Sequence, residues 1–240
     1  MPTKLVIFGG DVLTRMKTFG FCRELAKRSL NGSYAGVLED AANRNELDAK
    51  ARKFHGRIFS QDANLSLKRA LQQYCLAQLP SEGWYETVIQ WLGDHIDRVS
   101  LPYDDFFYHW NRMVTPNNAI LPVLTAVKEK HKVCGVFYVG HDHWLKILQF
   151  PLVQALSGRL ASCSPAIHGD LLGEAARMVH SKPRDVVYVG NDIQRVHDAE
   201  QHGFSVIRAE KSIKKLERQL CSFGLITPSP SFGKGRYMFN

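Results

Sequence analysis

The hydrophobic pattern of the chain begins with an unbroken apolar run, Leu5–Phe8, which ends on Gly9, Gly10 and Asp11. Apolar residues that do not alternate with polar ones predict a strand buried on both faces, as at the centre of a parallel α/β sheet. In open α/β sheets, ligands bind outside the carboxyl ends of the strands. Gly9, Gly10 and Asp11 are therefore the first candidates for a ligand pocket.

From Arg15 to about Thr115 the apolar residues follow a helical spacing, and no strand is expected. Pro80-Ser81-Glu82-Gly83 separates two such stretches. Their apolar faces consist of Leu67, Leu71, Tyr74 and Cys75, and of Tyr85, Val88, Ile89, Leu92, Ile96 and Val99. A dense aromatic group follows and is expected to pack inside this helical block: Tyr103, Phe106, Phe107, Tyr108 and Trp110.

The pattern changes after Pro116, where helical and strand-like stretches alternate. A short amphipathic helix contains Ile120, Leu124 and Val127, and a longer one spans 168–179. Further strands are predicted at 133–139, 185–189 and 204–207, and Gly203 is expected to end a helix. Strands that alternate with helices predict an α/β fold with a Rossmann-like parallel sheet.

Composition and charge narrow the class of protein. No stretch among the 240 residues approaches the roughly 20 apolar residues of a membrane helix. The polar start MPTK lacks a secretory signal, so a cytoplasmic protein without membrane contact is expected. The five cysteines are scattered and never spaced as CxxC, which argues against disulfides or structural zinc.

The chain is basic, with 31 Lys and Arg against 23 Asp and Glu and a net charge of +8. Anionic partners are therefore plausible. Lys211, Lys214, Lys215 and Arg218 are expected to form a solvated helix face. No sequence motif of a nucleic-acid-binding fold accompanies them, so nucleic acid stays possible but unsupported.

Four stretches carry a resemblance to a known family: TPNNAILPVLTAVKEKHKV, DHWLKILQFPLV, SCSPAIHGD and DVVYVGNDIQRVHDAEQHGF. Their order and spacing resemble the haloacid dehalogenase (HAD) superfamily with a helical cap, nearest to HAD-like phosphatases and phosphatase domains joined to epoxide hydrolases. The resemblance covers roughly residues 4–225. It implies a HAD-like core at 1–14 and 116–225, an inserted α-helical cap at 15–115 and a C-terminal tail at 226–240.

The resemblance also implies a catalytic set, and this chain departs from it at the first motif. HAD phosphatases use a nucleophilic aspartate after the first strand and an acid-base aspartate two residues later. These positions fall on Gly9 and Asp11. Glycine supplies no nucleophile, so loss of the covalent route is expected. In the alternative alignment Asp11 itself attacks, and no acid partner remains nearby.

The second and third motifs are altered as well. The family's Ser or Thr after the second strand falls where this chain reads Val139-Gly140-His141-Asp142-His143, with no hydroxyl, although the Gly140 amide could contact a ligand. Of His141 and His143, one ring is expected to be packed and one solvated. The family's lysine falls on His168 or Gly169, and Lys182 is expected to be solvated.

The fourth motif supplies acidic residues that bind Mg²⁺ in the family. Here it falls on Gly190 and Asn191, with Asp192 one place further and Val196 at the position of the second acid. One carboxylate with an amide oxygen is a thin set for the octahedral oxygen ligation of Mg²⁺. Asp192 is therefore at most a doubtful metal ligand.

Two hypotheses follow. The first is a HAD-like protein with an eroded phosphatase site, without a cofactor, that binds an anionic small molecule or a protein partner. The second is a divergent Mg²⁺-dependent phosphohydrolase for a small phosphorylated substrate, using Asp11 and Asp192. Because each follows a strand or opens a helix, Gly9, Gly140, His168 and Asn191 are predicted to converge at one edge of the sheet.

Overall fold

In the computed structural model, the described residues are 3–29, 41–59, 65–95, 101–163, 170–209 and 212–227. The chain divides into two compact units. Unit 1 comprises Met1–Arg15, Pro116–Tyr138 and Ile147–Asn240, and unit 2 comprises Met16–Thr115 and Val139–Lys146. Within the described residues, no helix is long and apolar enough to cross a membrane.

Unit 1 is built on a five-stranded sheet in the order β5-β4-β1-β6-β7. Its strands are β1 (Leu5–Gly9), β4 (Lys132–Phe137), β5 (Gly158–Ala161), β6 (Val186–Gly190) and β7 (Ser205–Arg208). Each neighbouring pair is parallel, with Leu5 opposite Lys132 on one side and Val186 on the other. All five residues of β1 are buried, as the unbroken apolar run predicts. The α/β fold with a Rossmann-like sheet is confirmed.

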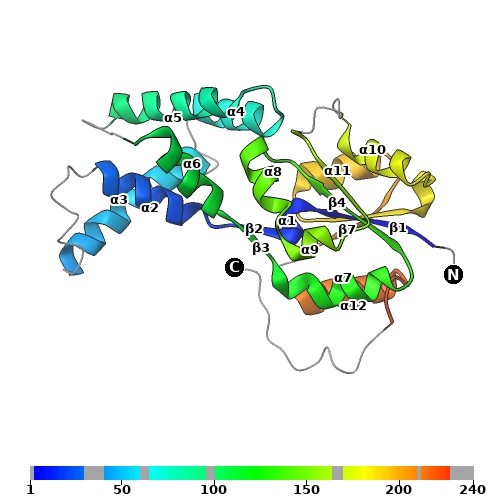
Figure 1. Ribbon diagram of the computed structural model, residues 1–240. Helices are drawn as coiled ribbons and strands as arrows, with labels where there is room; N and C mark the ends of the chain where they lie inside the picture. Colours follow the sequence, from blue (N-terminus) through cyan, green and yellow to red (C-terminus); the bar gives the residue numbers. More distant parts are fainter. Residues whose placement is uncertain are drawn as a thin grey trace. The chain divides into compact units, whose positions relative to one another are not determined.

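Helices cover both faces of this sheet (Figure 1). On one face lie α10 (Leu171–Met178) and α11 (Ile193–Gln201), and on the other α7 (Leu121–Lys128) and α12 (Ile213–Ser222). Shorter helices are α1 (Gly10–Leu13), η2 (Asn118–Ile120), α9 (Pro151–Gln154) and η3 (Pro183–Asp185). Gly203 follows α11 with φ +74°, a conformation that glycine adopts without steric cost, which ends the helix as predicted.

Unit 2 is helical around an aromatic core. Its helices are α2 (Thr18–Ser29), α3 (Ala41–Phe59), α4 (Leu65–Cys75), α5 (Ser81–His95) and α6 (Tyr103–Arg112). Phe21, Phe106 and Trp110 pack edge-on or stacked, with ring centroids 5.2–5.9 Å apart. The expected aromatic packing is confirmed for Phe106, Phe107 and Trp110, which are buried, whereas Tyr108 is exposed. Ile96 and Val99 lie outside the described residues.

The helix α8 (His141–Ile147) begins in the segment Val139–Lys146, which joins unit 2 although the sequence assigned it to the core. Its polar side chains explain this. The Tyr74 hydroxyl donates to Asp142 Oδ2 at 3.0 Å, and the Ser81 hydroxyl donates to the same oxygen. His143 Nε2 donates to the Trp110 carbonyl at 3.0 Å, and the two rings stack.

Three local expectations were wrong. The strands β2 (Thr14–Met16) and β3 (Val114–Pro116) pair at the two ends of the insertion, where no strand was expected. The strand β5 is short and was not predicted. The strand β4 ends at Phe137 and not at Val139. The apolar run that predicted the strand continues to Val139, but the pairing with β1 and β5 does not extend beyond Phe137.

Candidate functional site

The carboxyl edge of the unit 1 sheet brings two predicted site segments together. We use "carboxyl edge" for Gly9–Asp11 after β1 and Gly190–Asp192 after β6, which are neighbouring strands. Asp11 Oδ2 accepts hydrogen bonds from the Asn191 amide at 2.6 Å and the Asp192 amide at 3.0 Å. The predicted convergence is therefore confirmed for the segments that contain Gly9 and Asn191.

Gly9 occupies the position where the family's nucleophile is expected, and that space is already filled. A Cβ atom placed on Gly9 would collide with Asp11 Oδ1 and would lie 2.8 Å from the Tyr188 hydroxyl oxygen. Tyr188 is a buried residue of β6. A longer side chain at Gly9 would therefore require both Asp11 and Tyr188 to move.

Asp11 is held by the backbone of the neighbouring loop. Packing around its carboxyl raises the pKa above the ordinary value of 3.8, and the amides of Asn191 and Asp192 offset part of that rise. Its side chain still reaches solvent, which screens the repulsion from Asp192. The geometry makes Asp11 an acceptor for two amides at the beginning of α11.

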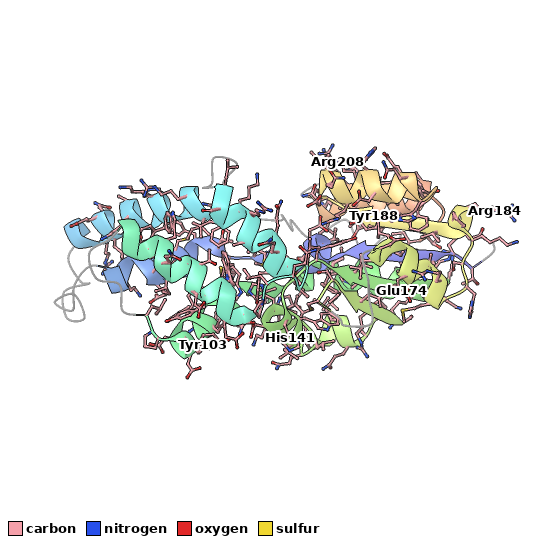
Figure 2. The ribbon with its side chains drawn as sticks, turned by 90° about the horizontal axis from the view of Figure 1, so that it is seen from above. Tyr103, His141, Glu174, Arg184, Tyr188 and Arg208 are labelled. Carbon is pink, nitrogen blue, oxygen red and sulfur yellow. The ribbon has the colours of Figure 1, made fainter. Side chains whose placement is uncertain are left out.

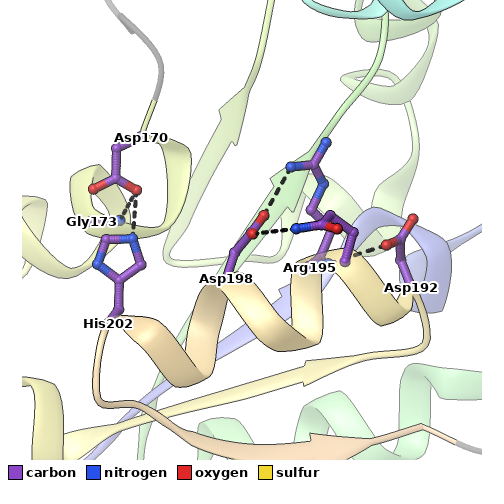
Figure 3. Close-up of polar contacts among 7 residues, drawn as sticks. Asp170, Gly173, Asp192, Arg195, Asp198 and His202 are labelled. Atoms are coloured by element: carbon purple, nitrogen blue, oxygen red, sulfur yellow. Dashed lines mark hydrogen bonds and ion pairs between the residues drawn. The ribbon is translucent and has the colours of Figure 1, made fainter.

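Asp192 has a structural task as well. Its side chain is the N-cap of α11 and accepts the Arg195 amide at 3.1 Å, as Figure 3 shows. N-cap carboxylates satisfy an amide that has no partner within the helix. Val196, the position of the second acid, adds no oxygen.

The donor set does not fit a resident Mg²⁺. Asp11 and Asp192 both accept backbone amides, and Gly9 provides no carboxylate. In the part of the chain that the structure describes, no group of three or more His, Cys, Asp or Glu side chains could hold a metal ion. Mg²⁺ requires several oxygens in octahedral geometry.

The sequence reasoning missed Tyr138, which directly follows β4 and does carry a hydroxyl. Burial raises the pKa of Tyr138 to about 12, so the phenol is protonated at neutral pH. The Arg195 guanidinium lies 3.6 Å from the centre of the Tyr138 ring and pairs with Asp198 at 3.0 Å (Figure 3). Tyr138 could have been found only from the strand register. The register pairs Gly9 with Val136 and so places Tyr138 just beyond the end of β1.

The remaining predicted residues lie elsewhere. Gly140 and His141 belong to unit 2, so their convergence with Gly9 stays a prediction. A Cβ on Gly140 would collide with the Tyr74 ring, which explains the glycine. His143 is buried and His141 exposed, which confirms one packed and one solvated ring. His168 and Gly169 lie outside the described residues.

Solved structures support the fold. No family model and no curated protein matches the chain. A HAD family enzyme from Bacteroides thetaiotaomicron, solved with magnesium and inorganic phosphate, is 14% identical with a TM-score of 0.58 over 87% of this chain and 95% of that one. An L-2-haloacid dehalogenase from Xanthobacter autotrophicus, solved with chloropropionic acid covalently bound, is 16% identical with a TM-score of 0.56 over 95% and 85%.

A third similar structure is a HAD phosphatase from Thermococcus onnurineus, 13% identical with a TM-score of 0.54 over 87% of each chain. At such identities the likeness concerns the fold alone. The chain therefore has the HAD-like fold, as the sequence resemblance implied.

Proposed function

We propose that this chain is a HAD-like protein that does not catalyse phosphoryl transfer and acts by binding. The observation that carries the proposal is the state of the nucleophile position. Gly9 has no reactive side chain, and Asp11 Oδ1 and the Tyr188 hydroxyl fill the adjacent space. Asp11 is also engaged by two amides, so its carboxylate does not stand free as a substitute nucleophile.

The nearby hydroxyls do not replace the missing carboxylate. Burial raises the pKa of both Tyr138 and Tyr188, so neither is deprotonated near neutrality. A protonated phenol is a weak nucleophile. With the metal donors engaged as well, the carboxyl edge lacks the main parts of a phosphohydrolase.

Of the two binding roles, a protein partner suits the carboxyl edge better than an anionic small molecule. The amides of Asn191 and Asp192 would suit a phosphate, but Asp11 already occupies them. Beside them Ile193 is 68% exposed. A protein partner would cover this apolar side chain on binding, whereas a phosphate would have to displace Asp11 from the two amides.

The alternative, a divergent Mg²⁺-dependent phosphohydrolase, has one observation in its favour. Asp11 reaches solvent, and its raised pKa is a property of acid-base catalysts. In this alternative Asp11 would act as proton donor and Asp192 would leave its N-cap position.

Hydrolysis of p-nitrophenyl phosphate, with and without millimolar Mg²⁺, tests the proposal. We expect no turnover above that of Asp11→Asn. Asp185→Asn, which makes the same chemical change at the other end of the sheet, is the control. Turnover that is lost in Asp11→Asn and kept in Asp185→Asn would establish the alternative.

Thermal unfolding tests the metal separately. A ligand present at 100 times its Kd stabilises by about 2.7 kcal/mol, which corresponds to several degrees in Tm. We expect millimolar Mg²⁺ to change Tm very little. A rise of several degrees that disappears in Asp192→Asn would show that Asp192 binds the metal.

A further inference from the structure

The opposite end of the unit 1 sheet carries a row of cations. We use "amino edge" for the end at which the strands begin, and "basic row" for five residues there: Lys4, Lys130, Lys132, Lys182 and Arg184. Lys4 precedes β1, Lys132 begins β4, and Lys182 and Arg184 lie just before β6. All except the half-buried Lys4 are exposed.

The topology fixes the order of these residues. The strands β4, β1 and β6 are consecutive in the sheet, and neighbouring strands lie about 4.8 Å apart. The Lys132 amide donates to the Lys4 carbonyl at 3.1 Å, which places those two residues side by side. The backbone positions of these residues therefore follow one another along the amino edge.

The row is basic on balance. Glu129 and Asp185 are the acidic residues next to it in sequence, against five cations. Across the described chain, no ion pair joins a member of the row to an acidic side chain. Helix dipoles do not account for the row, because Lys4 and Lys132 belong to strand starts.

His131 lies close to two of the cations in the row. The Lys4 amide donates to His131 Nδ1 at 3.2 Å, so the ring lies directly at the row. Burial lowers the pKa of His131 most, and the positive charges of Lys4 and Lys130 lower it further. The two lysines therefore act on the same small region.

One exposed aromatic residue belongs to a segment that contacts the row. Phe223 ends α12 and is 38% exposed. Four residues later, Thr227 accepts a hydrogen bond from Lys130 Nζ at 2.9 Å, which connects this segment to the row. A cationic track beside an exposed aromatic ring is the arrangement with which proteins bind single-stranded nucleic acids.

We propose that the amino edge of unit 1 binds the phosphate backbone of a single-stranded nucleic acid along the basic row. Repeated phosphates would face Lys132, Lys4 and Arg184, and a base would stack on Phe223. Figure 2 shows Arg184 at the far end of β6 from Tyr188. The surface is therefore separate from the carboxyl edge.

Two other polyanions fit less well. An acidic polypeptide would use the charges but not the aromatic ring. An anionic membrane requires apolar side chains that insert, as interfacial helices have. Near the row, the large apolar side chains that are exposed in the described chain are Phe223 and Met178. The linear row and single ring therefore favour a nucleic acid strand.

Fluorescence anisotropy with a labelled oligouridylate and the full chain tests this proposal. We expect affinity to fall as salt rises, with a slope in log Kd of about 0.7 for each phosphate neutralised. Lys132→Glu combined with Lys182→Glu should weaken binding by about tenfold or more and flatten the slope by about 1.4.

The matched control is Lys68→Glu combined with Arg69→Glu on α4, two exposed cations that give the same change in net charge. This pair should leave the affinity within about twofold, because long-range charge is screened at 0.15 M salt. Equal losses in both double variants, or no loss in the row variant, would overturn the proposal. Binding to phosphatidylserine vesicles or polyglutamate but not to the oligouridylate would overturn it too.

NMR titration of the His131 ring gives a second readout. Saturating oligouridylate should raise the pKa of His131, because phosphates offset the charges of Lys4 and Lys130. The ring of His180, an exposed histidine after α10, provides the comparison. An unchanged His131 titration in the saturated complex would place the nucleic acid elsewhere and contradict the proposal.

Discussion

At the carboxyl edge of the unit 1 sheet the charged side chains are bound by the backbone, whereas at the amino edge they extend from strand starts without acidic partners in the described chain. Asp11 and Asp192 accept amides around the first turn of α11. Within the described residues, no ion pair joins Lys132 or Lys182 to an acidic side chain. Both edges belong to one sheet, so their difference arises from the residues at the strand ends and in the adjoining loops.

The difference points to a structural role for the two carboxylates of the carboxyl edge. At the beginning of α11, amides without partners inside the helix need acceptors. Asp11 and Asp192 supply them, so the two carboxylates stabilise the loop. At the amino edge Lys132, Lys182 and Arg184 are exposed to solvent, whereas Lys130 donates to the Thr227 hydroxyl.

The largest effect is expected from placing a carboxylate at Gly9, the position of the nucleophile in HAD phosphatases. Gly9→Asp should lower the free energy of unfolding by about 1–3 kcal/mol, since the new side chain overpacks against Asp11 and Tyr188. Urea denaturation measures the loss. Tyr188→Phe in the same chain removes the hydroxyl and should recover part of it. A Gly9→Asp protein as stable as the parent would show that the space is open.

Removing the acceptor at the same edge should have the next largest effect. Asp11→Ala leaves the amides of Asn191 and Asp192 without their acceptor and should cost about 1–2 kcal/mol by urea denaturation. Asp11→Asn keeps an oxygen acceptor and should cost much less. Equal losses in the two variants would mean that charge, and not hydrogen bonding, makes Asp11 stabilising.

The two edges should also respond to pH with opposite signs. The pKa of Asp11 is raised in the folded state, so the native state binds this proton more tightly than the unfolded state does. The stability gained from the protonated carboxyl is therefore lost as pH rises above about 3.8. Stability curves of the parent and Asp11→Asn should therefore diverge above that pH, with the variant gaining. Stability curves that stay parallel through this pH range would contradict a raised pKa of Asp11 in the folded protein.

At the amino edge the folded pKa of His131 is lowered, so stability should fall as pH decreases below 6.5. The buried His143 contributes with the same sign. His131→Asn should remove its part of the dependence, because the Asn oxygen can accept the Lys4 amide. His180→Asn is the control, since Asn tolerates the left-handed backbone there, φ 51°. Equal flattening in both variants would exclude His131 as the source.

The smallest effect is expected from the basic row itself. Lys132→Gln should change the free energy of unfolding by less than about 0.5 kcal/mol, because the side chain is exposed and substitutions of exposed side chains usually have effects of that size. Asp192→Ala, which removes an N-cap, should cost about 1 kcal/mol in the same urea experiment. A Lys132 variant as unstable as the Asp192 variant would erase the contrast between the edges.

The sequence by itself determined the order of the elements and the fold class. Unbroken apolar runs identified the strands at Leu5–Gly9 and Val186–Gly190, and helical spacing identified the insertion. It also determined that Gly9 has no nucleophile and that Asp192 lacks a second acid at Val196. The strands and the insertion follow from residue types and local periodicity, whereas the statements on Gly9, Asp192 and Val196 follow from the resemblance to the HAD superfamily.

Only the tertiary structure decided what the remaining polar residues do. That Asp11 bonds the Asn191 amide depends on contacts between segments 180 residues apart. The end of β4 at Phe137, and with it the place of Tyr138 directly after the strand, depends on pairing with β1 and β5. The assignment of Val139–Lys146 to unit 2 depends on Tyr74, Ser81 and Trp110. Hydrogen-bond partners and strand register are set by distant segments, so no local pattern in the chain records them.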